Sequence, residues 1–350
     1  MKKLLQILLW ATIVLQATET LAQDPQFSQY YNAPLFLNPA FAGTAQNTRA
    51  ALNYRVQWPN VTTPFVSYAA SADHFIEPYN SGIGVVFRRD QEGDIGFRTN
   101  NIGLIYSYHV NITDKWKFVP ALQASYMSRG VDAGNMTFGD QIDDRGYTGA
   151  PTGESFGGLN THNLSFATGG LVYNPNLWVG FSAFHLNRPD LSFFTDGSGR
   201  LDMRYTVHGG YKFNLTNSMP SQRHNPQEIS ITPTFLYMRQ GVADRFDVGA
   251  YAVMDPVLFG FWYRGLPVKK YNESIHNHES LVFMAGFRHE GLMVSYSYDV
   301  TISKFTPASG GAHELSVIYS WELLYNKRKR RKPGKSARTP FPFLHQPATF

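Results

Sequence analysis

The stretch that decides the fold is 291–300, GLMVSYSYDV. Every second residue from Leu292 to Val300 is apolar or aromatic, and the residues between them are mostly small or polar. Successive side chains of a β-strand point to opposite faces, so this period of two predicts a strand with one apolar and one polar face. The same alternation recurs in 101–109 and in 314–322.

Reading the whole chain in this way predicts fourteen strands, and an even number is the rule for single-chain barrels of bacterial outer membranes. We therefore predict an all-β fold: an antiparallel transmembrane outer-membrane β-barrel of about 14 strands with an N-terminal plug or strap segment. The predicted strands are 48–58, 62–74, 82–90, 96–110, 114–128, 162–173, 176–186, 201–213, 227–239, 243–253, 256–264, 279–288, 291–300 and 312–323.

The lengths of the connections support a barrel over a soluble β-sandwich or propeller. Barrels have short periplasmic turns and longer extracellular loops. Here the even-numbered connections are short except for 214–226, and long connections fall among the odd-numbered ones, namely 129–161, 187–200, 265–278 and 301–311.

Composition and charge limit the class of protein. With 43% hydrophobic, 15% aromatic and only 16% charged residues, the chain is not disordered. The absence of Cys excludes a disulfide scaffold and a cysteine nucleophile. The formal net charge of +5 comes from one segment, because 327–338 carries eight basic residues and no acidic one.

The first 22 residues have the three parts of a secretory signal peptide. Lys2 and Lys3 form a basic start, 4–15 form an apolar core too short to span a bilayer, and Ala22 ends a small-residue cleavage site. We expect cleavage after Ala22 and a mature protein in the outer membrane with both termini in the periplasm. The expected organisation is a signal peptide at 1–22, a strap or plug at 23–47, a barrel at 48–323 and a basic periplasmic tail at 324–350.

Residues 23–47, QDPQFSQYYNAPLFLNPAFAGTAQN, do not alternate and are too apolar for a free tail. Asn38 and Pro39 could cap a single helical turn, with Asn at the N-cap and Pro at the first position. Two interpretations stay open: a segment that docks a partner, or a plug that merely closes the lumen. Its candidate contact residues are Phe27, Tyr30, Tyr31, Asn38, Pro39 and Phe41.

This segment also carries a family resemblance. QDPQFSQYY followed by LNPAFAGT resembles the N-terminal signature of the PorP/SprF-type outer-membrane proteins of the Bacteroidetes type IX secretion and gliding system, and the TFGDQID of 137–143 agrees with it. The resemblance implies a non-enzymatic barrel, without cofactor, whose partners are a cognate secreted cargo, outer-membrane lipids and the periplasmic lipoprotein ring. Relatives often end in a short segment with Cys and Pro, whereas this chain ends RTPFPFLHQPATF, so any role of that end is doubtful here.

Two further segments are candidates for partner contact. The loop 129–161 contains Asp140, Asp143 and Asp144, which could converge on calcium, although their spacing does not match an EF-hand and a solvated acidic loop is the simpler interpretation. The tail contains Lys327, Arg328, Lys329, Arg330, Arg331 and Lys332, which suit an acidic partner or anionic lipid rather than nucleic acid.

Catalysis has little support in the sequence. No G-x-S-x-G, H-E-x-x-H or P-loop motif occurs, although Ser107, His109 and Asp299 could meet in a lumen. The alternative function is a passive porin or hydrophobic-solute transporter. In that case the cations facing the lumen would set selectivity, namely Arg55, Arg88, Lys117, Arg204, Lys212, Arg264 and Arg288.

Overall fold

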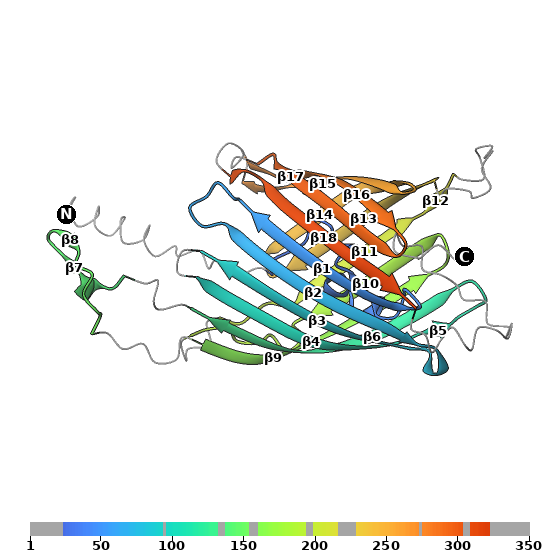
Figure 1. Ribbon diagram of the computed structural model, residues 1–350, viewed down its shortest axis with the longest axis horizontal. Helices are drawn as coiled ribbons and strands as arrows, with labels where there is room; N and C mark the ends of the chain where they lie inside the picture. The colour runs from blue at the N-terminus through green and yellow to red at the C-terminus, as the bar shows by residue number, and fades with distance from the viewer. Residues whose placement is uncertain are drawn as a thin grey trace, which may run out of the picture.

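The protein is a closed antiparallel β-barrel (Figure 1). The computed structural model describes residues 24–93, 96–131, 137–153, 160–193, 199–215, 229–272, 275–303 and 309–322. Each strand pairs with the next along the chain, and pairing between the first and last strands, from Thr48 opposite Trp321 to Gln57 opposite Ala312, closes the sheet.

The barrel wall consists of fourteen strands within the described residues, which confirms the predicted fold and strand number. Val110–Asn111 (β5) continues β4, and Phe213–Asn214 (β12) continues β11 along the same neighbours. The strands are β1 Thr48–Gln57, β2 Phe65–Ile76, β3 Ser81–Glu92, β4 Phe97–Tyr108, β6 Lys117–Gly130, β9 Asn160–Tyr173, β10 Leu177–Phe184, β11 Arg204–Tyr211, β13 Ile229–Gln240, β14 Ala243–Met254, β15 Val257–Asn272, β16 Ile275–His289, β17 Leu292–Thr301 and β18 Ala312–Trp321.

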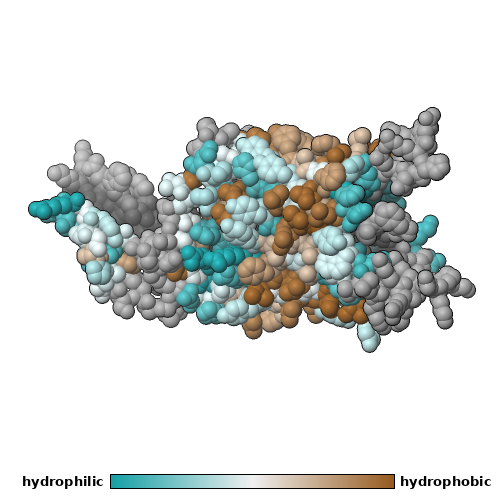
Figure 2. Space-filling view, in the orientation of Figure 1, coloured by the Kyte–Doolittle hydropathy of each residue, from teal (hydrophilic) through white to brown (hydrophobic). Residues whose placement is uncertain are grey.

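The alternation of the sequence becomes the two faces of the wall. On β17 Leu292 and Tyr296 are exposed on the outside, whereas Ser295 and Ser297 are buried in the lumen. The same outward exposure of large apolar side chains recurs around the barrel, as at Leu104 and Leu122. Figure 2 shows hydrophobic residues gathered across the middle of the visible wall, as contact with lipid requires. No described helix is long and apolar enough to cross a membrane.

The two ends of the barrel differ. We call the end where β1 begins and β18 ends the turn end; there Glu77–Tyr79 (η2) and the two-residue turns 255–256 and 290–291 connect strands. The opposite end is the loop end, where 131–159 connects β6 to β9. A small hairpin of Ile142–Asp143 (β7) and Gly146–Tyr147 (β8) lies in that connection, beyond the wall (Figure 1).

The prediction of a loop at 265–278 is wrong. β15 and β16 continue to pair up to Asn272 and Ile275, with register shifts at Arg264/Gly265 and beyond Leu266. Each shift interrupts the period of two, so the alternation disappears from the sequence while the strands continue. Tight connections at 93–96 and 241–242 likewise make the length difference between the two ends smaller than predicted.

Candidate functional site

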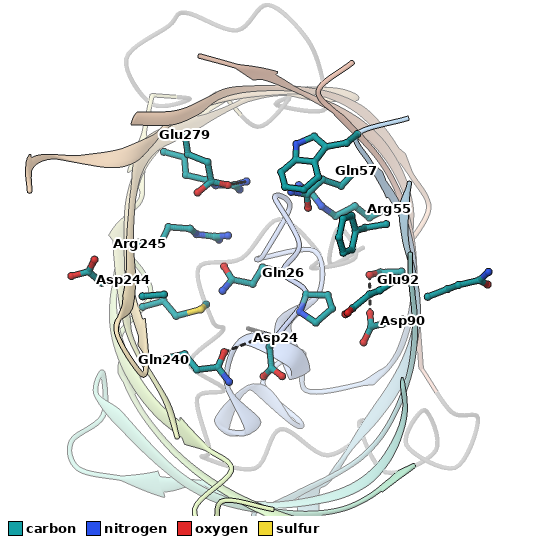
Figure 3. Close-up of a pocket in the computed structure, with 18 residues that line it drawn as sticks. Asp24, Gln26, Arg55, Gln57, Asp90, Glu92, Gln240, Asp244, Arg245 and Glu279 are labelled. Atoms are coloured by element: carbon teal, nitrogen blue, oxygen red, sulfur yellow. Dashed lines mark hydrogen bonds and ion pairs between the residues drawn. The ribbon is translucent and has the colours of Figure 1, made fainter. Parts of the chain in front are cut away.

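Residues 24–47, which we call the plug, run through the lumen from the loop end to the turn end (Figures 1 and 3). Near the loop end, the backbone N–H of Asp24 donates to Oε1 of Gln240, the last residue of β13, at 2.9 Å. Near the turn end, the backbone N–H of Gly43 donates to Asp73 Oδ2 on β2 at 2.8 Å. Asp24, the first described residue, therefore lies near the opposite end of the barrel from Trp321, the last residue of β18, and the termini themselves lie outside the described residues.

Ser28 is the centre of an ionic cluster in the loop-side half of the lumen. Its Oγ accepts hydrogen bonds from Arg55 Nη1 at 2.6 Å and Arg264 Nη2 at 2.9 Å. The same Oγ donates to Asp299 Oδ2 at 2.5 Å, and the Ser28 N–H donates to Glu314 Oε2 at 2.7 Å. Arg55 also pairs directly with Asp299 and Glu314, so the wall charges neutralise one another and the plug adds neutral contacts.

Asp24 is the only charged residue of the plug, and it is buried. Its Oδ2 lies 2.8 Å from His185 Nε2 and 2.9 Å from Arg204 Nη1, and Arg88 Nη2 lies 3.6 Å from its Oδ1. Burial alone would raise the pKa of Asp24, but the contacts with His185 and with the Arg204 guanidinium outweigh burial and hold the pKa well below its ordinary value. Asp24 is therefore a charged anchor for the first residues of the plug.

The turn-side half of the lumen is an apolar core built around the plug. Tyr31 packs edge-on against Trp178 with ring centroids 5.6 Å apart, and its hydroxyl donates to the Gly209 carbonyl at 3.1 Å. Phe41 is fully buried beside His208 at 5.2 Å between centroids. The core also contains Tyr30, Leu35, Leu37, Ala40 and Ala42 of the plug and Val119, Leu171, Tyr173, Leu258, Trp262 and Met293 of the wall.

The predicted Asn38–Pro39 turn is confirmed. Pro39–Phe41 (η1) is a single 3₁₀ turn that follows the four-residue helix Pro34–Leu37 (α2), and Asn38 Oδ1 accepts from Ala40 N at 2.9 Å. The Asn38 amide also donates to two wall carbonyls, of Gly170 at 3.1 Å and of Phe181 at 3.0 Å. Gly169 makes room for this turn, because a Cβ there would lie 2.0 Å from Asn38 Oδ1.

Above the plug, toward the loop end, lies a cavity of about 400 Å³ that we call the vestibule (Figure 3). Its floor is Asp24, Pro25 and Gln26, and its wall includes side chains of both charges, of which Arg55 and Arg264 belong to the ionic cluster. Trp58 and Phe65 form an edge-on aromatic pair on one side, with ring centroids 5.4 Å apart. The remaining lining residues are Gln57, Ser67, Asp90, Gln91, Glu92, Met238, Gln240, Ala243, Asp244, Arg245 and Glu279.

The plug residues singled out from the sequence come together in the lumen. Phe27, Tyr30, Tyr31, Asn38, Pro39 and Phe41 are all buried. In this conformation they contact the wall of the barrel and are covered from any separate partner.

The acidic loop residues lie elsewhere, near the β7–β8 hairpin. Asp140 accepts from the Thr152 hydroxyl and the Gly153 N–H, and Asp143 Oδ1 accepts from Arg145 N at 2.8 Å. Asp144 is exposed. Within the described ranges, no group of three or more His, Asp or Glu side chains could hold a metal ion. Lys327 to Lys332 lie outside the described residues.

Ser107, His109 and Asp299 do not form a catalytic group. Ser107 Oγ and His109 Nε2 both contact the Ala42 carbonyl of the plug, at 2.8 and 3.0 Å, whereas Asp299 lies in the ionic cluster beside Arg55 and Arg264. Five of the seven cations proposed for porin selectivity form ion pairs: Arg55, Arg88, Arg204 and Arg264 pair with buried carboxylates, and Arg288 pairs with Asp255 at 2.5 Å.

Sequence reasoning missed the ionic cluster and the anchor at Asp24. One signal was available, because Arg55 and Glu314 both occupy inward positions of the strands that close the barrel. Only the register, which places Arg55 directly opposite Glu314, shows that they meet.

Comparison with known proteins finds one matching family. The profile of the family described as type IX secretion system membrane protein PorP/SprF matches residues 19–319. No curated protein matches the chain. Among solved structures, a monoaromatic hydrocarbon channel, CymD, is 12% identical over 83% of this chain and 93% of its own, with a TM-score of 0.44. A mutant porin of Rhodopseudomonas blastica is 9% identical over 79% of this chain and 99% of its own, with a TM-score of 0.34. Since the family profile covers most of the chain, this protein belongs to the PorP/SprF family of type IX secretion system membrane proteins.

Proposed function

We propose that this protein is a non-enzymatic outer-membrane component of the type IX secretion system that binds a cognate secreted cargo, with an adhesin-like C-terminal sorting domain, and the periplasmic machinery. Its role is export of that cargo or its retention at the surface. The observation that carries the proposal is the plug, which fills the turn-side half of the lumen with buried side chains. A lumen filled with buried side chains leaves solutes no open route through this half, which favours a role in binding proteins at the two ends of the barrel over a role as a pore.

The proposed orientation places the turn end in the periplasm and the loop end outside the cell. Short turns belong on the periplasmic side of such barrels and long loops on the outer side. β18 ends at the turn end. In this orientation we propose that the basic tail that follows it, Lys327 to Lys332, lies in the periplasm and binds the lipoprotein ring. The β7–β8 hairpin, with Asp140, Asp143 and Asp144 near it, would face the cargo.

The plug residues contribute to partner binding indirectly. Phe27, Tyr30, Tyr31, Asn38, Pro39 and Phe41 keep the barrel closed and hold the strands that carry the loops, so their role is to support the docking surfaces. In this proposal the loop contacts the cargo directly and the tail contacts the periplasmic machinery directly.

Two measurements on the purified full-length protein test the function. In planar bilayers we expect no large steady conductance, and from cells we expect the barrel to co-purify with the C-terminal domain of its secreted partner. A large steady pore and no co-purifying partner would contradict the secretion role and support a passive porin or solute transporter.

The docking surfaces are tested separately. Deleting 137–153 removes the hairpin but leaves all fourteen wall strands, so the barrel should still assemble while cargo is released into the medium. Replacing Lys327 to Lys332 with Gln should abolish capture of the periplasmic ring. Cargo retained after the deletion, or a ring captured after the replacement, would remove that surface from the proposal.

A further inference from the structure

The inner wall of the barrel binds a polypeptide through its backbone. Arg204 Nη2 donates to the Phe36 carbonyl at 3.1 Å, and Ser182 Oγ donates to the Leu37 carbonyl at 2.8 Å. Glu314 accepts the backbone N–H groups of two successive plug residues, at 2.7 and 3.1 Å. Contacts of this kind recur from Asp24 to Gly43. The wall therefore forms hydrogen bonds with the irregular main chain of the plug along the whole depth of the lumen.

The vestibule continues this wall beyond the point where the plug begins. Its floor is formed by plug residues, and three of its lining residues, Arg55, Gln240 and Arg264, already contact plug atoms. Its volume of about 400 Å³ is of the size of a small ligand site.

Among the side chains that line the vestibule, Arg245 and Gln26 keep polar atoms without hydrogen-bond partners in the part of the chain that the structure describes. They are Nε of Arg245, whose side chain is 10% exposed and pairs through Nη2 with Asp247 Oδ2 at 3.0 Å, and Oε1 of Gln26. Arg55 Nε and Asp90 Oδ2 also have no hydrogen-bond partner, but both side chains already form ion pairs along the wall. Both side chains extend toward the middle of the cavity, one from β14 and one from the plug (Figure 3). Arg245 can only donate and a Gln carbonyl can only accept, so an occupant that satisfies both side chains has to supply an acceptor and a donor.

A peptide unit has this combination, since its carbonyl accepts and its N–H donates. After a rotation of the two side chains, a peptide carbonyl would accept from Arg245 and a peptide N–H would donate to Gln26. The aromatic pair Trp58–Phe65 supplies an apolar surface for a side chain of the same segment. A simple anion would satisfy Arg245 alone, and Glu92 and Glu279 in the lining disfavour it.

We propose that the vestibule is a peptide-binding site that takes a short extended segment of another polypeptide end-on to the plug. The site deepens the proposed function and rests on it for the identity of the partner, the secreted cargo, because the vestibule lies at the loop end. Binding itself is measured on the purified barrel and does not depend on secretion.

The probe is a set of blocked, fluorescent pentapeptides whose central residue is Asn, Tyr, Leu, Arg or Glu, titrated against the full mature chain in detergent by anisotropy. We expect at least one peptide to bind, and R245A and Q26A each to weaken it about tenfold, as loss of one hydrogen bond with a charged or buried partner implies. The matched control is R239A, because Arg239 is on the outer face of β13 and should leave binding unchanged. Heat-modifiable migration on a gel confirms that each variant is folded.

Three results would overturn the site. The first is that no peptide binds the mature chain, and the second is that R245A and Q26A bind the peptide as well as the unsubstituted protein does. The third is that acetate displaces the peptide as effectively as it would displace a simple anion, which would show a general anion site. These results are distinct from failure of the function. If the barrel binds peptides but conducts as an open pore, the peptide site is supported and the secretion role is contradicted. If the barrel is closed and co-purifies with cargo but binds no peptide, the secretion role is supported and the peptide site is contradicted.

Discussion

The two halves of the lumen hold the same plug by different means. In the turn-side half, Tyr31 and Phe41 are fully buried among Trp178, Leu171 and other apolar side chains. In the loop-side half, the plug meets charges through Ser28 and Asp24, and an open cavity lies above it. One half is a protein core, and the other is a polar surface with a cavity above it.

This difference indicates which part of the plug can change. If the plug left the turn-side half, Trp178, Trp262 and Leu171 would be exposed to water, at a cost of about 25 cal/mol for each Å² of apolar surface. If only its first residues moved, Arg55 and Arg264 would keep their partners Asp299 and Glu314. We therefore expect the turn-side half to stay closed and any movement of the plug to involve its first residues, in the loop-side half.

The largest effect is expected from a side chain that fills the space occupied by the plug in the turn-side half. In G169V the side chain would occupy the position of Asn38 Oδ1, which is 2.0 Å from the ideal Cβ. We expect loss of the folded barrel, at a cost above the usual 1–3 kcal/mol for overpacking, about 3 kcal/mol or more. The fraction that migrates as a compact barrel on an unheated gel measures it.

Gly170 provides the matched control for that variant. It is the next residue of β9 and faces outward, where a Cβ meets only Phe118 at 3.5 Å. G170V should assemble normally. Equal assembly of both variants would show that the plug does not seat on β9 as described.

The next largest effect is expected from emptying the apolar core. F41A removes a fully buried ring beside His208 and should lower the free energy of unfolding by about 3–5 kcal/mol. F36A, at a partly buried ring of the same plug, should cost clearly less. Urea titration followed by tryptophan fluorescence compares them, and an F41A cost no larger than that of F36A would argue against a tight core in the turn-side half.

Local features of the turn-side half were predictable from the sequence, whereas the contacts of the loop-side half were not. The Asn38–Pro39 turn is fixed by neighbouring residues, and the period of two after Thr48 places every wall strand. The ionic cluster joins Ser28, Arg55, Asp299 and Glu314, which are far apart in the chain, so it depends on register and on the path of the plug. Irregular pairing hid the ends of β15 and β16 for the related reason that bulges erase alternation.

A smaller effect is expected from the ionic cluster. S28A removes the hydroxyl that accepts from Arg55 and Arg264 and donates to Asp299, and should cost about 1–3 kcal/mol, because buried charged groups lose a partner. The barrel should still close, because the charged side chains of the wall remain paired with one another. S71A, at a buried serine of the same lumenal wall on β2, is the control and should be nearly neutral. Loss of assembly in S28A would mean that the loop-side half is as indispensable as the core.

The most local change concerns the anchor at the start of the plug. D24N keeps the shape but removes the charge that pairs with His185 and Arg204, so the first residues should loosen while Phe41 stays buried. Because the folded pKa of Asp24 lies below its ordinary 3.8, the charge stabilises the fold above that pH, and its contribution disappears as the pH falls through 3.8 and below. A cysteine at Gln26 reports this, since this chain has no other: it should react faster with a maleimide in D24N at neutral pH. Unchanged reactivity in D24N, or equally fast reaction of a cysteine at Ala40, would show that the two halves of the plug move together, contrary to the difference drawn between them.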